Sequence, residues 1–239
     1  MLVTSAAYGQ KSDTSLGKPI FWCQVSDPES MFMGAEGPLF VLYDNGNVLY
    51  WRQGAYYLTN LDDDDLQTMQ SVLHLQDTFF DHSRYYDATT DHPENGPGYI
   101  DCRTTNFFIR RDTVIRVVVY GEITKQEFRK RLPPVFLKAN DALTSFSDDR
   151  ANPWIPTKIQ VLLLDFSYST NTPVPWPKEW PDLNSPGSVR GEDVSLILLD
   201  KRDVKELQRL LKKTKGQRAI LIDEKKYFVG YRLPIPGLY

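Results

Sequence analysis

Apolar residues run along 39–43 and 48–51, on either side of one short polar turn. The stretch reads LFVLYDNGNVLYW, and its β-branched and aromatic side chains favour strands. The turn is built on Asp44, Asn45 and Gly46. A two-residue turn of the primed type needs positive φ at both central residues, and Asn-Gly supplies this at the lowest steric cost. The pattern therefore predicts a β-hairpin closed by such a turn.

Other segments with a strand-like pattern of apolar residues recur along the chain, and segments with helical spacing lie between them. Strands or hairpins are predicted at 20–25, 56–58 (as an edge strand), 106–120, 158–166, 194–199 and 219–232. Apolar residues three and four positions apart predict helices at 61–75, 125–130, 135–146 and 203–213. Thr59 or Asn60 suits the N-cap of the first helix, with Asp62 placed as in a capping box. The polar, Pro- and Gly-containing residues 81–101 predict a long loop.

This order of elements predicts an α+β fold, in which antiparallel β-hairpin sheets are covered by amphipathic helices. We expect three regions. They are an N-terminal arm with room for a short strand (1–36), a hairpin-helix-hairpin-helix unit (37–150), and a unit of strand, Pro/Trp-rich segment, strand, helix and hairpin (151–239). The last two regions share a strand-then-helix order, which predicts two similar halves. Independent repetition of hairpin and helix explains that order equally well.

Charge is distributed unevenly along the 239 residues, although the net charge is only −3. Residues 1–100 carry 4 basic and 14 acidic side chains, residues 101–200 carry 13 of each, and residues 201–239 carry 11 basic and 4 acidic ones. Such asymmetry can steer a charged partner or simply bring the two ends of the chain together. A nucleic-acid site would need stacking aromatics beside the basic helix at 203–213; Tyr227 and Phe228 lie on the following hairpin, but the pI of about 5.7 argues against such a site. We therefore expect no nucleic-acid site.

Two segments are the candidate binding residues. The first is the acidic run Asp62, Asp63, Asp64 and Asp65, which also suits the positive end of a helix dipole. The second is the pair Trp176 and Trp180, because tryptophan offers a large apolar area together with one hydrogen-bond donor. The alternative for the tryptophans is that both rings pin an irregular connection onto the core.

Signals for catalysis or metal binding are sparse. His82 and His92 share the polar loop with several aspartates, and Cys102 follows it, but no metal-ligand spacing is present. Cys102 with His92 has the residue types of a thiolate–imidazole pair, or Cys102 is a buried thiol or a disulfide partner of Cys23. No phosphate-binding glycine loop, dinucleotide fingerprint or nucleophile elbow occurs, so we expect no catalytic residue, metal or cofactor.

The chain contains no apolar run long enough to span a membrane. Residues 2–8 (LVTSAAY) have the small residues that end a signal peptide, and a disordered arm explains them equally well. With an upstream leader the protein is expected in the periplasm or outside the cell, where Cys23 and Cys102 can form one disulfide. Without a leader it is expected in the cytoplasm with two free thiols.

Several features together resemble a family of uncharacterised bacterial proteins, mostly exported or lipoprotein-like, that carry a Leu-Tyr-Gly-Asp-Gly-x-Val-x-Tyr hairpin. These features are the LYDNGNVLYW hairpin, the Leu-(Asp)4-Leu-Gln helix start, a Phe-Phe pair, a Tyr-rich loop, a strand ending in VVVYG at Gly121, and the later PWIP (153–156) and WPKEWP (176–181) segments. Asp44-Asn45-Gly46 replaces the usual turn of that hairpin. The resemblance covers most of residues 37–239 and implies an envelope or periplasmic setting.

We therefore expect a non-enzymatic protein that binds a ligand or a protein partner. An alternative is an immunity or inhibitor protein that neutralises a basic toxin or enzyme with the acidic residues at 61–65 and 77–94. A third alternative is a hydrolase that uses Cys102 or the loop of His82 and His92. Each alternative predicts a different surface, which the three-dimensional arrangement can compare.

Overall fold

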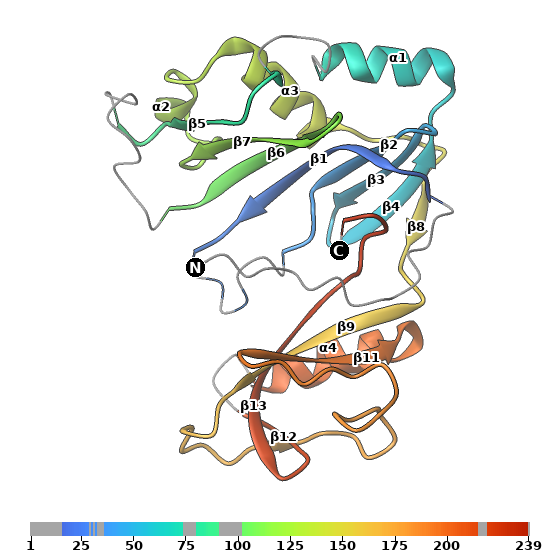
Figure 1. Cartoon of the computed structure of the whole chain (residues 1–239), viewed down its shortest axis with the longest axis vertical. Coiled ribbons are helices and arrows are strands. Elements are labelled where there is room, and N and C mark those ends of the chain that lie inside the picture. The colour runs from blue at the N-terminus through green and yellow to red at the C-terminus, as the bar shows by residue number, and fades with distance from the viewer. Residues whose placement is uncertain are drawn as a thin grey trace. The chain divides into compact units, whose positions relative to one another are not determined.

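The computed structural model describes residues 16–28, 30, 32, 36–73, 80–90, 102–214 and 219–238. Within these residues, four α-helices and thirteen strands form an α+β fold with two mixed sheets (Figure 1). The chain divides into two compact units, Met1–Trp154 with Pro236–Tyr239, and Ile155–Ile235. The predicted fold class, sheets combined with helices in an α+β arrangement, is thereby confirmed. The similarity of two halves stays a prediction.

The first unit contains an eight-stranded sheet in the order β5-β7-β6-β1-β2-β3-β4-β8. Its strands are β1 (Pro19–Ser26), β2 (Phe40–Tyr43), β3 (Asn47–Arg52), β4 (Ala55–Asn60), β5 (Arg84–Asp87), β6 (Thr104–Arg110), β7 (Val114–Tyr120) and β8 (Asn152–Trp154). Its helices are α1 (Asp63–Val72), α2 (Gln126–Arg129) and α3 (Pro134–Ser145). Neighbouring strands pair antiparallel, except that β5 pairs in parallel with β7.

Alternation along these strands places one set of side chains in a single apolar core. Phe21, Phe40 and Phe107 project from three neighbouring strands, and Phe136 of α3 packs on them with its ring centroid 4.6 Å from that of Phe107. All four side chains are fully buried. Burying a side chain of this size contributes about 1.5–3 kcal/mol. Figure 1 shows the three helices on one side of this sheet, which is the side that the core occupies.

The second unit contains a five-stranded sheet in the order β10-β12-β13-β9-β11. Its elements are β9 (Lys158–Asp165), β10 (Val174–Pro175), β11 (Val194–Asp200), the 3-10 turn Lys201–Asp203, α4 (Val204–Thr214), β12 (Ile220–Ile222) and β13 (Lys225–Arg232). Leu207 and Leu210 of α4 are buried against Val161 and Ile197 of the sheet. Strand β10 pairs in parallel with β12, and the other pairs are antiparallel.

The structure confirms one local prediction and corrects two others. The strand predicted at 20–25 is β1, and it lies inside the sheet between β6 and β2. The strand predicted as an edge at 56–58 is β4, which β8 flanks on its outer side. The loop predicted at 81–101 contains β5, because its Tyr85 and Tyr86 pair in parallel with β7, a long-range contact that local patterning does not encode. Residues 91–101 of that loop lie outside the described residues.

The turn between β2 and β3 differs from the predicted type. Strand register leaves a three-residue loop, Asp44 to Gly46, and the Gly46 amide donates to the Tyr43 carbonyl (3.2 Å). Gly46 has φ +83°, whereas Asn45 is not among the residues with positive φ. This is a three-residue hairpin loop with glycine in the left-handed position. The two-residue primed turn lies instead between β3 and β4, where both Gln53 and Gly54 have positive φ.

Gly46 also fixes the segment that leads into α1. The Leu61 amide donates to the Gly46 carbonyl (2.9 Å), and a Cβ placed on Gly46 would lie 2.5 Å from the Leu61 carbonyl oxygen. A side chain at this position therefore meets both backbone strain and a backbone clash. Gly54 has the same φ of +83° but open space around it. Comparing substitutions at the two glycines therefore distinguishes the cost of positive φ from the cost of the clash with Leu61.

We predict that Gly46→Ala lowers the free energy of unfolding by about 2–4 kcal/mol, and that Gly54→Ala lowers it by about 1 kcal/mol. The larger loss follows from the clash with Leu61, since both variants carry the same strain of positive φ. Urea denaturation followed by circular dichroism measures both changes. Equal losses in the two variants would show that Gly46 is required for its conformation alone.

None of the helices formed by the described residues combines the length and the apolar character needed to cross a bilayer.

Candidate binding groove

The acidic run at the start of α1 divides into residues with different roles. Asp62 is the N-cap, and its carboxylate accepts a hydrogen bond from the Asp65 amide (2.9 Å). The predictions of Thr59 or Asn60 as the cap and of a helix from 61 are therefore wrong. Both residues belong to β4, which stays paired with β3 through Asn60. Leu75, the predicted last residue of this helix, lies outside the described residues; the helix as described ends at Val72.

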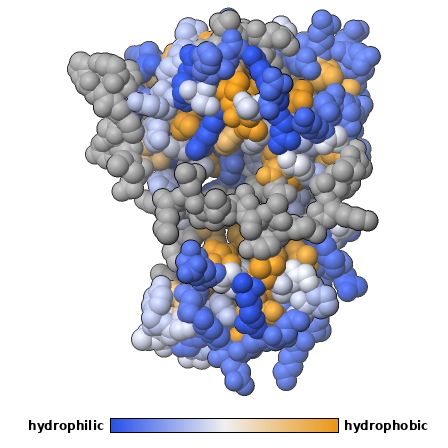
Figure 2. All heavy atoms as spheres, viewed as in Figure 1, coloured by the Kyte–Doolittle hydropathy of each residue, from blue (hydrophilic) through white to orange (hydrophobic). Residues whose placement is uncertain are grey.

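A groove of about 470 Å³ lies beside α1, between this helix and the connection from α3 to β8. It combines apolar side chains with charged ones. The lining residues are Leu61, Asp65, Thr68, Met69, Val72, Phe146, Ser147, Asp148, Asp149 and Arg150. Leu61 is buried, Met69 and Phe146 are half-buried, and Val72 is exposed, so apolar carbon continues from the core to the surface. In the part of the surface where Figure 1 draws α1, Figure 2 shows hydrophilic atoms with hydrophobic atoms between them.

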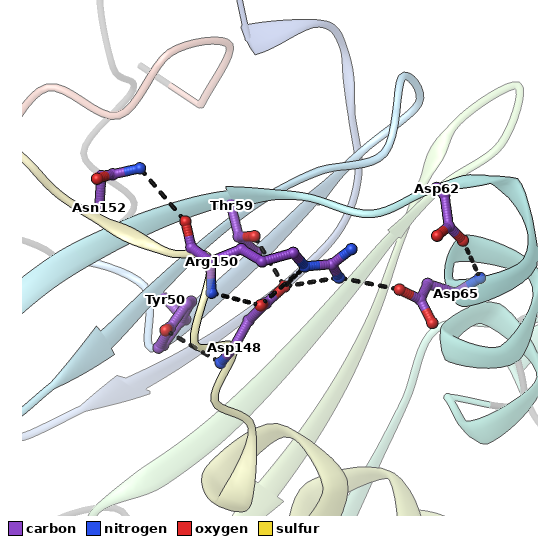
Figure 3. Close-up of polar contacts among 7 residues, drawn as sticks. All are labelled: Tyr50, Thr59, Asp62, Asp65, Asp148, Arg150 and Asn152. Carbon is purple, nitrogen blue, oxygen red and sulfur yellow. Dashed lines mark hydrogen bonds and ion pairs between the residues drawn. The ribbon is translucent and has the colours of Figure 1, made fainter.

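Asp148 anchors the α3–β8 connection to the sheet (Figure 3). Its carboxylate accepts hydrogen bonds from the Thr59 hydroxyl of β4 (2.8 Å), from the Arg150 amide (2.8 Å) and from the Arg150 Nε and Nη2 atoms. The Asp148 amide donates to the Tyr50 hydroxyl of β3 (3.4 Å). The side chain is only 10% exposed. A carboxylate this well supplied with donors fixes the connection in one conformation.

These donors change the acidity of Asp148. The hydrogen bonds from the Arg150 guanidinium, followed by those from the Arg150 amide and Thr59, lower the pKa of Asp148 from its ordinary 3.8 to about 2 against the opposing effect of burial. The same contact raises the pKa of Arg150. Asp148 is therefore ionised at neutral pH and acts as an acceptor, which does not suit the role of a general acid.

Arg150 joins the two walls of the groove. Its Nη2 atom lies 2.9 Å from Asp148 Oδ2 and 2.9 Å from Asp65 Oδ2 on α1 (Figure 3). The pair with Asp65 is solvent-exposed, and such pairs contribute about 0–1 kcal/mol. Its value is geometric, since one planar guanidinium contacts carboxylates that are 83 residues apart in the sequence (Asp65 and Asp148). The Arg150 carbonyl also accepts from Asn152 Nδ2 at the start of β8 (3.3 Å).

The surroundings of the groove keep a strong negative charge. Asp63, Asp64 and Asp149 are exposed, and within the described residues none of them forms an ion pair. Asp62 to Asp65, Asp148 and Asp149 are six carboxylates against one guanidinium, which gives a local net charge of −5. An anionic rim beside apolar carbon suits a cationic, amphipathic ligand. The lining contains neither histidine nor cysteine.

The structure places the two candidate tryptophans away from solvent. Trp176 and Trp180 are 8% and 7% exposed, and their rings form an edge-to-face pair with centroids 4.8 Å apart. The Trp176 Nε1 atom donates to the Pro181 carbonyl (2.9 Å), and both rings belong to the core of the second unit. These contacts agree with the alternative in which the rings pin the connection onto the core. Ligand binding by these rings stays a prediction.

The reactive side chains considered from the sequence are only partly described. His82 is exposed, while His74 and His92 lie outside the described residues, so the pairing of Cys102 with His92 stays a prediction. Cys23 and Cys102 are not joined in a disulfide, and burial raises the pKa of Cys23 above its ordinary range. Across the part of the chain that the structure describes, no three His, Cys, Asp or Glu side chains gather in a way that could hold a metal ion.

The acidic wall of the groove was predictable from the sequence, but its other wall was not. The predicted boundary between regions fell after residue 150, whereas Asp148 and Arg150 supply the main polar contacts of the groove. The available signal was an Asp-x-Arg sequence directly after a helix, because aspartate accepts readily from the backbone two residues later. The partners Thr59 and Asp65 are distant in sequence, so no local pattern indicates them.

Searches of family models, of curated proteins and of solved structures found no match to the chain.

We predict that Asp148→Asn lowers the free energy of unfolding by about 1–2 kcal/mol near pH 7, because a neutral amide accepts more weakly from Arg150. The folded-state pKa of Asp148 is depressed, so its contribution is present above the unfolded-state pKa of 3.8 and is lost as the pH falls towards about 2. The gap between wild type and variant should narrow over that range.

Asp149→Asn is the matched control, because Asp149 is exposed and neighbours Asp148. It should change stability by less than about 0.5 kcal/mol at either pH. Urea denaturation of both variants near neutral and near acidic pH provides the comparison. A gap for Asp148→Asn that stays constant with pH would contradict the assigned role.

Proposed function

We propose that the chain is a non-enzymatic protein-binding protein and that the groove beside α1 holds a basic, amphipathic segment of its partner. The observation that carries this proposal is a groove with partly apolar lining and a local net charge of −5 in and around it. Charge gives speed and specificity of association, and apolar contact gives affinity. A ligand that offers both is a helix or extended segment with lysine or arginine beside apolar side chains.

Apolar contact is the part of the site that charge alone does not explain. Val72 is 40% exposed at the end of α1 and lies in the same lining as Met69 and Phe146. An exposed aliphatic side chain beside half-buried ones offers a ligand a surface that continues into the core of the unit. Burying it would release water from both partners.

Preformed geometry supports binding over catalysis. Arg150 and Asp148 hold the second wall of the groove against β3 and β4 before any ligand arrives. A rigid site avoids much of the cost of ordering on association. The ionised state of Asp148 fits an anionic acceptor surface.

An immunity or inhibitor role is the second candidate, and the exposed Asp63, Asp64 and Asp149 are the observation that favours it. Their charge is free to meet a basic toxin or enzyme, as inhibitors of cationic enzymes do. Residues 77–79 and 91–94 of the expected acidic face lie outside the described residues. The resemblance to exported bacterial proteins supports a periplasmic or envelope setting for either role. Cys23 and Cys102 would then be in an oxidising compartment.

A synthetic helical peptide of about 18 leucine and lysine residues, labelled with a fluorophore, tests the proposed ligand chemistry. We predict binding at low salt, with the dissociation constant raised about tenfold by Asp149→Lys. Asp112→Lys is the matched control, since Asp112 is exposed on the β6–β7 turn outside the groove lining. It should change the constant less than about twofold. Fluorescence anisotropy measures both.

The apolar part of the site has its own variant pair in the same assay. Val72→Ser should weaken peptide binding about three- to tenfold, while Val114→Ser, at a residue 46% exposed on β7, should leave it unchanged. Binding that responds to Asp112→Lys as strongly as to Asp149→Lys, or to neither valine variant, would contradict binding in the groove.

A further inference from the structure

The exposed side of α4 in the second unit is strongly basic. Six cations are exposed on α4 and the 3-10 turn before it, against two acidic side chains, Asp203 and Glu206. These cations are Lys201, Arg202, Lys205, Arg209, Lys212 and Lys213. Arg202 lies near Asp200 and Asp203, at 3.9 Å and 3.8 Å. Within the described residues, the other five cations form no ion pair. Their charge therefore faces solvent.

Helical spacing aligns the α4 cations in one stripe. Lys205, Arg209 and Lys212 follow one another at intervals of four and three residues, which places them on one side of the helix. Leu207 and Leu210 are buried on the other side. An eleven-residue helix is about 16 Å long. The stripe therefore presents a short, straight row of positive charge.

The chemistry of this stripe favours an acidic protein surface as its partner. Membrane insertion needs a free apolar face, and the apolar face of α4 is already packed in the core of its unit. Single-stranded nucleic acid is held by stacking aromatics beside the cations, and the sequence of α4, VKELQRLLKKT, contains no aromatic residue. A row of lysine and arginine matches instead a row of carboxylates on another protein.

We infer that α4 docks on the acidic groove of a second copy of the chain. The inference rests on the proposed function and names the basic segment that the groove holds, with the apolar contact supplied by lysine and arginine stems because the apolar side chains of α4 are buried. α1 has ten residues and α4 has eleven, and each is anchored in its own unit while its charged side faces outwards. The local charge of −5 around the groove meets six cations and two acids, a net +4, on α4 and its preceding turn. The long lysine and arginine stems can cover Val72 and Met69.

The proposed contact joins two different surfaces of the same chain, so it is heterologous. Such contacts either close into a ring or continue into an open chain of molecules. Because exposed ion pairs are screened by salt, association should be weak and should disappear at high ionic strength.

A charge-swap experiment on the full chain tests the inference. One variant, Asp64→Lys with Asp149→Lys, reverses the charge of two exposed residues outside the Arg150 network and takes the local charge around the groove from −5 to −1. The other, Arg209→Glu with Lys212→Glu, takes the charge of α4 and its preceding turn from +4 to 0. Sedimentation velocity is measured at roughly 50 mM salt over protein concentrations up to about 0.5 mM. Wild type should associate as its concentration rises, each variant alone should remain monomeric, and an equal mixture of the two should associate again.

Lys130→Glu with Lys138→Glu is the matched control for the α4 variant, because it makes the same change in net charge, −4, at exposed positions outside both surfaces. It should associate as wild type does. A monomeric wild type, association that survives either swap, or a mixture that stays monomeric would each overturn the inference. If wild type is monomeric but still binds the leucine–lysine peptide through Val72 and Asp149, the proposed function stands without self-association. If the chains associate but the peptide does not bind, the proposed ligand chemistry is wrong.

Discussion

The contact of one guanidinium with two carboxylates is the constraint on which the candidate site depends. Arg150 lies in the connection after α3, and its Nη2 atom meets Asp148 beside it and Asp65 on α1. Asp148 in turn accepts from Thr59 on β4. A helix, a connection and a strand thus share one small polar network. This network links the two walls of the groove by polar contacts, in addition to the apolar core on which Met69 and Phe146 both pack.

The aspartates at the start of α1 contribute to the fold and are also the residues for which recognition of a basic partner is proposed. Asp62 caps α1, and the next three carboxylates lie at the positive end of its dipole, where each can contribute about 0.3–1 kcal/mol. Mutual repulsion reduces that sum, and only Asp65 has a cationic partner among the described residues. Asp63 and Asp64 repel the neighbouring carboxylates of the unit, and the same negative charge would attract a basic partner. Recognition by this surface would therefore also relieve a local repulsion.

Much of the fold was predictable from the sequence, but only the acidic wall of the groove was. Hairpins and helices follow from local alternation and spacing, which is why the elements around Phe107 and Leu207 lie where they were expected. Strand β5 was missed because parallel pairing with β7 is a long-range contact. The turn at Gly46 was assigned the wrong type because Asn-Gly fits both a two-residue and a three-residue loop. Arg150 was missed because its significance depends on where Asp65 and Thr59 are in space.

Nuclear magnetic resonance can locate the surface to which a basic amphipathic ligand binds. Titration of a ¹⁵N-labelled chain with the leucine–lysine peptide reports on each backbone amide and on the side-chain Nε–H of Arg150. We predict that the largest chemical-shift changes fall on residues 63–72 and 146–150, around the groove. The Arg150 Nε–H signal should shift with them. Shifts that gather on other strands of the sheet or on the second unit, with the Arg150 signal unmoved, would contradict it.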